Sequence, residues 1–343
     1  MTPFSIINAI PLVGTPNREL FYGAYFQHFS GSGIVDYQCG PKVFENHRGI
    51  DILLQNFAVQ DSGVTVQAIA PGRVLRVDDG FFDRQTRRPN PGGYGNHVRL
   101  SHASGFTTIY GHLRKNSVLV AVNDSVNAGD ALGLVGSSGN SNWPHLHFEV
   151  QRGGVAVDPY TGPCHSVESL WQSQLAYQDS FIVLDGGMMD PSDADFARLL
   201  ERPDDVDTVR TSDDTVWFWA ELFNIQADAL RFRLSDPAGQ LFKEFNYGAW
   251  RTFSVTFFAL PISVAGSLTD VGTWTLNSHQ VPAGSSEFEL IWTQRFELVA
   301  DITAQPLRGP PSDEERGKLV IWEGPVDGPS PVIRRVISPV TVR

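Results

Sequence analysis

The sequence contains little cysteine, little positive charge and no long apolar run. Its 343 residues include only Cys39 and Cys164, which are too few for a disulfide-rich scaffold and do not form a CxxC pair. No apolar stretch approaches the roughly 18 residues of a membrane-spanning helix, so we expect no membrane span. The 26 Lys and Arg against 38 Asp and Glu give a net charge of −12. Because phosphate contacts need a basic surface, we expect no nucleic-acid partner.

A secretory signal peptide is not visible either. The first 20 residues lack a positively charged start, and Asn8 and Pro11 interrupt their apolar stretch. Export would therefore need a signal already removed from this sequence, or another route. A single disulfide between Cys39 and Cys164 would suit an exported protein. Two unlinked thiols are the alternative, and neither residue has a local feature that would lower its pKa.

The composition is that of a folded protein whose charge is unevenly spread. Hydrophobic residues make up 41% and charged residues 19%. Residues 1–170 hold 12 basic and 13 acidic residues, a net of −1, whereas residues 171–343 hold 14 and 25, a net of −11. The difference favours two units with different surroundings. A solubilising acidic surface on the second half is the simpler explanation.

Short β-like runs separated by glycine dominate residues 41–160, and we predict a first domain at residues 41–180. Residues 1–40 are aromatic-rich and indicate a strand or cover segment that precedes it. The predicted strands cover residues 64–70, 73–77, 97–101, 107–110, 131–135 and 146–151. Residues 78–95 have no strand pattern and predict a long loop, a feature that is commonly functional or mobile.

The remaining residues, 181–343, predict an acidic accessory domain of β-sandwich, immunoglobulin-like type. Alternating or apolar runs at residues 216–223, 229–234 and 287–292 predict strands, and DPAG and VPAG predict turns between strands. Residues 166–176 and 192–201 are expected to form short helices, and residues 306–331 a loop or edge segment. The tryptophans of this half are interpreted as core rather than a sugar-binding platform, and no second active site is expected here.

Four of the nine histidines occur with an aspartate in patterns typical of a metal site. His47 and Asp51 have an HxxxD spacing, His145 and His147 an HxH spacing, and His112 lies between them in YGHL. On a strand, positions i and i+2 point to one face, so the HxH pair projects together. The other five histidines, without obvious partners, are His28, His97, His102, His165 and His279.

The HxxxD pair requires a bent backbone. A straight strand would separate His47 from Asp51 by roughly 13 Å, so one metal could not reach both. Gly49 between them permits the bend. Two histidines and one aspartate suit zinc and leave a fourth position for water, which is the catalytic rather than the closed structural pattern. HExxH is absent, so another group must handle the proton.

The ordered motifs HRGID, GYGNHVRLSH, TTIYGHL, VNAGDALGLVGSSG and PHLHFEV resemble the M23 family of zinc peptidases, of the lysostaphin and LytM type, from about residue 37 to 159. The resemblance implies an antiparallel β peptidase domain with a zinc groove. It implies that His47, Asp51 and His147 bind Zn²⁺, and that His112 and His145 do catalytic work. All five residues are present.

What the resemblance further implies is a zinc endopeptidase that cuts peptide crosslinks or bridges of bacterial peptidoglycan, in the periplasm or outside the cell. Zinc would activate the water nucleophile while the two other histidines orient that water, relay its proton or bind the oxyanion. Glycine bridges and D-amino-acid crosslinks remain equally open as substrates. Loops 78–95 and 136–144 are expected to wall the cleft, with Trp143 either lining it or packed behind it.

Three other interpretations compete with this one. A biotinyl or lipoyl carrier domain shares the glycine-rich core, but it needs a lysine at the hairpin tip and the nearest, Lys115, lies outside. Hydrolysis of a non-peptidoglycan amide is a second. The strongest rival is a non-catalytic or latent cell-wall-binding or regulatory protein of the same fold, in which residues 1–40 or the acidic domain fill the groove.

Overall fold

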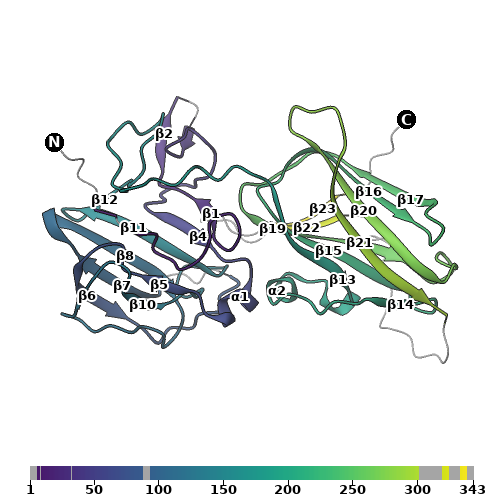
Figure 1. The fold of residues 1–343 in the computed structure, drawn as a ribbon, viewed down its shortest axis with the longest axis horizontal. Coiled ribbons are helices and arrows are strands. Elements are labelled where there is room, and N and C mark those ends of the chain that lie inside the picture. Colours follow the sequence, from purple (N-terminus) through teal and green to yellow (C-terminus); the bar gives the residue numbers. More distant parts are fainter. Residues whose placement is uncertain are drawn as a thin grey trace. The chain divides into compact units, whose positions relative to one another are not determined.

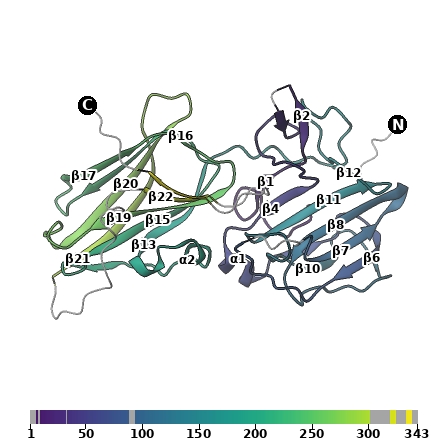
Figure 2. The same ribbon diagram turned by 180° about the vertical axis from the view of Figure 1, so that it is seen from behind.

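The computed structural model describes residues 6–7, 9–31, 33–87, 93–300, 319–323 and 333–337. The chain divides into two compact units, with the division of the main chain between Asp179 and Ser180. Both units are built mainly of strands, which confirms the mainly β prediction (Figures 1 and 2). Among the described residues, no helix has the length and apolar content needed to cross a membrane.

An eight-stranded antiparallel sheet forms the first unit's framework. Its order is β1-β4-β11-β8-β7-β6-β9, with β12 paired to the far part of β11. The bounds are β1 Phe21–Ala24, β4 Ile50–Leu53, β6 Gly72–Asp78, β7 Asn96–Ser101, β8 Phe106–Leu113, β9 Ser125–Val126, β11 His145–Arg152 and β12 Val155–Val157. All six strands predicted for residues 64–151 are present, counting β5 and β10 below.

Smaller elements surround this sheet. They are the hairpin β2 His28–Ser30 and β3 Gly33–Val35, the pair β5 Thr65–Gln67 and β10 Ala131–Leu134, the helix α1 Phe57–Ser62 and a 3₁₀ turn at Ala103–Gly105. Asn56 begins α1 by accepting a hydrogen bond from the backbone N–H of Val59, and Gly63 ends it at φ 86°. Of the loop predicted at residues 78–95, Asp78 is the last residue of β6, and the described part of residues 79–95 contains no named strand.

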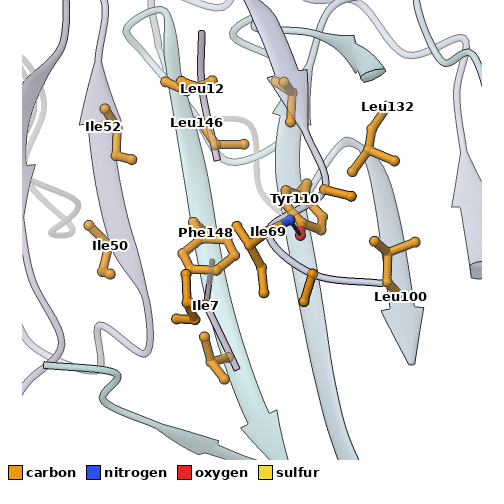
Figure 3. Packing of buried hydrophobic residues seen from close by; sticks show 14 of the residues in the cluster. Ile7, Leu12, Ile50, Ile52, Ile69, Leu100, Tyr110, Leu132, Leu146 and Phe148 are labelled. Atoms are coloured by element: carbon orange, nitrogen blue, oxygen red, sulfur yellow. Dashed lines mark hydrogen bonds between the residues drawn. The ribbon is translucent and has the colours of Figure 1, made fainter. Parts of the chain in front are cut away.

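One face of the sheet carries the hydrophobic core. Along β11, Leu146, Phe148 and Val150 point into a cluster that also holds Ile50 and Ile52 from β4 (Figure 3). Tyr110 of β8 lies in the same cluster, and its hydroxyl accepts a hydrogen bond from the backbone N–H of Ile69 at 3.0 Å. Because strand side chains alternate, the intervening residues of β11 all face the opposite side. That second face is where the histidines lie.

The N-terminal segment is part of the first unit. It contributes β1 to the edge of the main sheet, and its aromatic rings are buried, Tyr25 packing edge-on against Tyr37 and Tyr160. The disulfide between Cys39 and Cys164 links this segment to the chain that follows β12. Of the two possibilities considered from the sequence, the disulfide is therefore present and not two unlinked thiols.

The helix predicted at residues 166–176 is wrong. This segment has no regular structure, because its backbone bonds to the N-terminal segment instead of to itself. The N–H groups of Ile6 and Ile7 donate to Leu170 O, and the N–H of Gln172 donates to Ile7 O. In residues 192–201 the structure has a 3₁₀ turn, Pro191–Asp193, and then the short helix α2, Phe196–Leu200, capped by the Asp195 side chain.

In the second unit, two sheets share one core. The first sheet has the order β13-β15-β19-β22-β23, and the second β14-β21-β20-β16-β17 with β18 paired to β16. Among the strands described for this unit, only the β14–β21 pair is parallel. The bounds are β13 Ile182–Met189, β14 Thr208–Arg210, β15 Thr215–Phe223, β16 Gln226–Ser235, β17 Leu241–Tyr247, β18 Trp250–Arg251, β19 Val255–Ser263, β20 Gly272–Pro282, β21 Glu289–Val299, β22 Leu319–Glu323 and β23 Ile333–Ile337.

Aromatic rings join the two sheets. Phe218 of β15 and Phe258 of β19 both contact Phe232 of β16, with ring centroids 6.2 and 5.3 Å apart. Trp219 and Trp274 are also buried, in agreement with their interpretation as core residues. Of the predicted loop or edge segment 306–331, residues 319–323 form β22, which is an inner strand between β19 and β23. The remainder of that prediction lies outside the described residues.

Candidate metal centre and catalytic site

Strand register brings the two histidine motifs together. β11 lies between β4 and β8, and its His147 is the register partner of Asp51 on β4 and of Gly111 on β8. His145 is two residues earlier on the same face of β11, and His112 follows Gly111 on β8. Alternation alone would direct His112 to the opposite face, but its φ of 62° departs from strand geometry and its ring centroid lies 4.7 Å from that of His145. The HxH, HxxxD and YGHL motifs, which are far apart in sequence, thereby meet on one face of three adjacent strands.

Three side chains form a compact donor set. His47 Nε2 lies 3.1 Å from Asp51 Oδ1 and 3.4 Å from His147 Nδ1, and His147 Nδ1 lies 2.8 Å from Asp51 Oδ1. Zinc bonds of ~2.0–2.1 Å would place tetrahedral ligands about 3.3 Å apart, so these separations fit such an ion. All three residues are buried. The sequence predicted this set, and the structure brings its members together.

A bend at Gly49 makes the short His47–Asp51 separation possible. The chain turns at Gly49 before β4 begins at Ile50. A Cβ atom at Gly49 would lie 2.7 Å from both the His147 ring and the backbone oxygen of Phe148. Glycine is therefore required here for the close approach of His147 and Phe148.

Outer hydrogen bonds orient the donor rings. His47 Nδ1–H donates to the backbone oxygen of Tyr25 at 2.7 Å, which leaves Nε2 for the donor set. On the other side of His147, its Nε2 lies 3.6 Å from Glu149 Oε2. The hydroxyl of Tyr94 donates to the same Glu149 oxygen at 2.6 Å. This carboxylate–imidazole arrangement holds the His147 ring with Nδ1 directed at Asp51.

Charge is concentrated around His147. Burial opposes a charged imidazolium, but hydrogen bonds with Asp51 and Glu149 outweigh it and raise the pKa of His147 to about 10. Burial also opposes a charged Glu149, yet hydrogen bonds from His147, Tyr94 and Gln151 lower the pKa of its carboxyl to about 2. The metal-free site therefore holds a cationic His147 between two carboxylates, and a metal ion would take the place of its Nδ1 proton.

His112 and His145 are held in one tautomer by backbone carbonyls. His112 Nδ1–H donates to Ser138 O at 2.6 Å, and His145 Nδ1–H donates to Trp143 O at 2.8 Å. Each ring thereby turns its Nε2 atom away from those carbonyls, and His145 Nε2 lies 3.9 Å from Asp51 Oδ1. The two ring centroids are 4.7 Å apart. His112 has a φ of 62°, an uncommon value for a side chain of this size, and such strain is frequent at functional sites.

His112 is neutral in this environment. Burial lowers the pKa of His112 well below its usual value, and the neighbouring His145 and His147 lower it further. With the proton fixed on Nδ1, the neutral ring carries a lone pair on Nε2. That atom can accept a hydrogen bond or a proton.

Two loops meet beside these histidines. Asn96 N–H donates to Ser138 Oγ, and Asn140 N–H donates to the backbone oxygen of Gly93. A Cβ at Gly95 would lie 2.5 Å from backbone atoms of Ser138 and Gly139, so glycine permits the loops to touch. The described parts of the two loops expected to form the cleft walls thus contact each other next to the site.

The remaining sequence candidates lie behind or beside the site. Trp143 is fully buried and donates its indole N–H to Leu54 O, so its side chain packs rather than lining a groove. His97 is held by Gly95 O and Asp78, and His102 by Pro71 O and Thr108, so neither joins the donor set. Arg48 is exposed and donates to the Tyr94 hydroxyl.

Glu149 was missed from the sequence. It lies two residues after His147 on β11 and faces the site, with 1% of its surface exposed. The period of two that connected His145 to His147 extends to this residue, so the same signal could have identified it. His28 and His165 also have a partner that the sequence did not indicate, Asp158.

Comparisons with known proteins agree with the site. Residues 45–159 match the family described as Peptidase family M23. The DD-carboxypeptidase/endopeptidase Mpg of Neisseria meningitidis serogroup B is 35% identical over 113 residues, which cover 33% of this chain and 22% of that protein. The murein hydrolase activator EnvC of Escherichia coli K12 is 40% identical over 97 residues, covering 28% and 20% respectively.

A solved structure is similar to part of the chain. The catalytic domain of lysostaphin from Staphylococcus simulans is 28% identical, with a TM-score of 0.27, and the match covers 42% of this chain and 90% of that one. The chain spans about a fifth of the length of the curated relatives it matches.

Proposed function

We propose that this chain, whose residues 45–159 form a domain of peptidase family M23, is a zinc-dependent endopeptidase that hydrolyses peptide crosslinks or bridges of bacterial peptidoglycan. The observation that carries the proposal is the convergence of His47, Asp51 and His147 with His112 and His145 on one face of three strands. An intact set of five supports a catalyst rather than a degenerate relative.

His47, Asp51 and His147 would hold the zinc ion through Nε2, Oδ1 and Nδ1. Zinc in that position supplies Lewis acidity that polarises a carbonyl and lowers the pKa of a coordinated water toward ~7. Tyr25 and Glu149 fix the tautomers of the two imidazole ligands from outside. The donor chemistry, two imidazoles and one carboxylate, supports zinc over calcium or magnesium, which prefer oxygen ligands.

His112 and His145 would handle the proton. Neutral His112 has its Nε2 lone pair available, so it is suited to accept a hydrogen bond or proton from the attacking water. His145 is fixed in the same tautomer, with its Nε2 3.9 Å from Asp51 Oδ1, and can orient the water or stabilise the oxyanion. Burial of both rings excludes bulk water and strengthens these interactions.

The second unit would be an accessory immunoglobulin-like β-sandwich, covering residues 181–343 after a peptidase domain at 41–180 and the N-terminal segment 1–40. A periplasmic or secreted location is supported by the Cys39–Cys164 disulfide, because such bonds persist in oxidising compartments.

A second candidate is a latent or regulatory wall-binding protein of the same fold. Two observations support it: the five site residues expose at most 7% of their surface, and one relative is named a murein hydrolase activator. The test is zinc content together with release of soluble fragments from purified peptidoglycan, for wild type and His145→Ala, with His102→Ala as an off-site control. Cutting by wild type and the control, with zinc retained but cutting lost in His145→Ala, supports the peptidase. Zinc retention without fragments from any wall chemistry would move the latent protein to first place.

A further inference from the structure

A second cluster of metal-binding side chains lies outside the site described above. It consists of His28 at the start of β2, Asp158 just after β12, and His165 next to the disulfide-bonded Cys164. His28 Nε2 lies 2.7 Å from Asp158 Oδ2 and 3.4 Å from His165 Nδ1. One donor atom from each residue lies within 4.8 Å of the other two.

The spacing matches that of the first donor set. There the three separations are 2.8, 3.1 and 3.4 Å, and the composition is likewise two imidazoles and one carboxylate. Tetrahedral zinc would place its ligands about 3.3 Å apart. The second cluster therefore has the same donor types as the first, and its two separations of 2.7 and 3.4 Å are close to those of the first.

The positions of the protons on the two imidazole rings also favour a cation at this position. Without one, His28 Nε2–H donates to Asp158, so a proton on His165 Nδ1 would face another N–H group. His165 Nδ1 must therefore direct a lone pair at the position that the Asp158 oxygen also faces. A ring with a lone pair on Nδ1 is the form that binds metals.

Asp158 needs a countercharge that the protein supplies poorly. Its side chain has no exposed surface, and its Oδ1 accepts the backbone N–H of Tyr160 at 2.9 Å, which orients the carboxylate. Among the described residues, no lysine or arginine forms an ion pair with Asp158. A buried carboxylate without a permanent cation is costly, and a divalent ion would remove that cost.

The cluster is linked to the first site through residues 25–28. Beside His28, the N–H of Gln27 donates to the backbone oxygen of His47 at 3.0 Å, and Tyr25 O accepts the His47 ring proton. An ion on His28 would anchor this short segment to Asp158 and His165, which lie 130 and 137 residues later in the sequence. We propose that His28, Asp158 and His165 bind a second divalent transition cation of the zinc class, which fixes residues 25–28 against His47.

The first test counts ions. Chelator-stripped protein is dialysed against defined free Zn²⁺ and the bound metal is measured for wild type, His165→Gln, His47→Gln and the double variant. The second site predicts that His165→Gln holds one equivalent less than wild type, that His47→Gln also holds one less, and that the double variant holds two less. His279→Gln, in the second unit, is the matched control and retains the wild-type content.

The outcomes separate the two sites. If His165→Gln binds as much zinc as wild type, the second site does not exist, whatever His47→Gln does. If His47→Gln alone retains the wild-type content, the first site fails and the second stands. Both substitutions keep a polar side chain of similar size, so each variant should fold. Circular dichroism and thermal melting in chelator check this.

The anchoring role has its own readout. In the His47→Gln background, where the first site is disabled, Zn²⁺ should slow hydrogen exchange of the Gln27 amide at least severalfold, and it should not do so when His165→Gln is added. Equal exchange rates with and without Zn²⁺ would overturn the anchoring role. An X-ray absorption spectrum showing nitrogen and oxygen ligands at ~2.0–2.1 Å in His47→Gln would support the donor set directly.

Discussion

Asp51 on β4 lies directly opposite His147 on β11, and its Oδ1 accepts a hydrogen bond from His147 Nδ1 at 2.8 Å. This register converts two distant motifs into one centre, because Asp51 Oδ1 also lies within 3.1 Å of His47 Nε2. A shift of one residue between the strands would turn one of the two side chains toward the core. The predictions below follow from the groups that hold this pair.

Replacing Glu149 should weaken the zinc site without removing a ligand. Glu149→Gln keeps the size and can still accept the Tyr94 hydroxyl hydrogen bond, but it removes the charge facing His147 Nε2. Loss of such an outer partner typically costs about 10–100-fold in metal affinity or activity. Competition titration with a zinc chelator measures the affinity. The exposed Glu287→Gln is the control, and an unchanged affinity in Glu149→Gln would remove Glu149 from the centre.

Zinc binding at the first site should strengthen as pH rises. The pKa of His147 is raised to about 10 in the metal-free protein, so below that pH binding must displace one proton. The apparent Kd should therefore fall about tenfold per pH unit between about pH 6.5 and 8.5. Titrations in a His165→Gln background isolate this site. A Kd that does not change with pH would show that His147 is already deprotonated.

Gly49 should tolerate no side chain. In Gly49→Ala the new Cβ would lie 2.7 Å from the His147 ring and from Phe148 O, so one of these must move. Overpacking of this kind costs about 1–3 kcal/mol, and here it displaces a ligand. Zinc content and peptidoglycan cutting should both fall. Gly248→Ala, where no atom lies within 4 Å of the added Cβ, should behave as wild type; full zinc content in Gly49→Ala would contradict the argument.

Lys42 should make the first unit less stable at lower pH. Burial lowers the pKa of its ammonium from 10.5 to about 7, although Asp36 and Asp179 oppose the shift. Between these values the unfolded chain binds more protons than the folded one. The penalty is therefore absent above about pH 10.5, grows as pH falls, and is complete below about pH 7.

Urea unfolding at several pH values measures this effect. The stability of wild type relative to Lys42→Met should rise with pH by up to about 1.4 kcal/mol per unit in that window. Backbone oxygens of Tyr22 and Gln178 accept hydrogen bonds from Lys42, so the absolute stability of the variant can change in either direction. The slope is the criterion. Exposed Lys115→Met should leave this slope unaltered. Equal slopes for wild type and Lys42→Met would show that the pKa of Lys42 is the same in the folded and the unfolded chain.

Spacing and alternation were sufficient to find the donor set. HxH places two histidines on one strand face, and the short HxxxD pair demands a bend at Gly49, so local geometry singled out His47, Asp51, His145 and His147 as candidates. The division into metal ligands and catalytic histidines came from the resemblance to the M23 family. Six strands within residues 64–151 and the strands β15, β16 and β21 were also predicted, since their β-branched, aromatic and alternating patterns are local properties. β4 of the first unit and the other strands of the second unit were not predicted. The predicted helix at residues 166–176 was wrong because backbone groups of this segment form hydrogen bonds with Ile6 and Ile7, which lie far away in the sequence.

The sequence by itself determined which residues carry the chemistry and, for His145 and His147, which face of the strand they occupy, because side-chain direction follows from strand periodicity. His112 is the exception, since its φ of 62° departs from strand geometry. Only the tertiary structure decided which of these side chains contact one another. Pairing of β4 with β11 sets Asp51 against His147. Hydrogen bonds from His147 and Tyr94 lower the pKa of Glu149 against the effect of burial, and burial keeps His112 neutral. His28 reaches Asp158 and His165 across 130 and 137 residues. Contacts of that separation depend on the whole fold, and no local pattern encodes them.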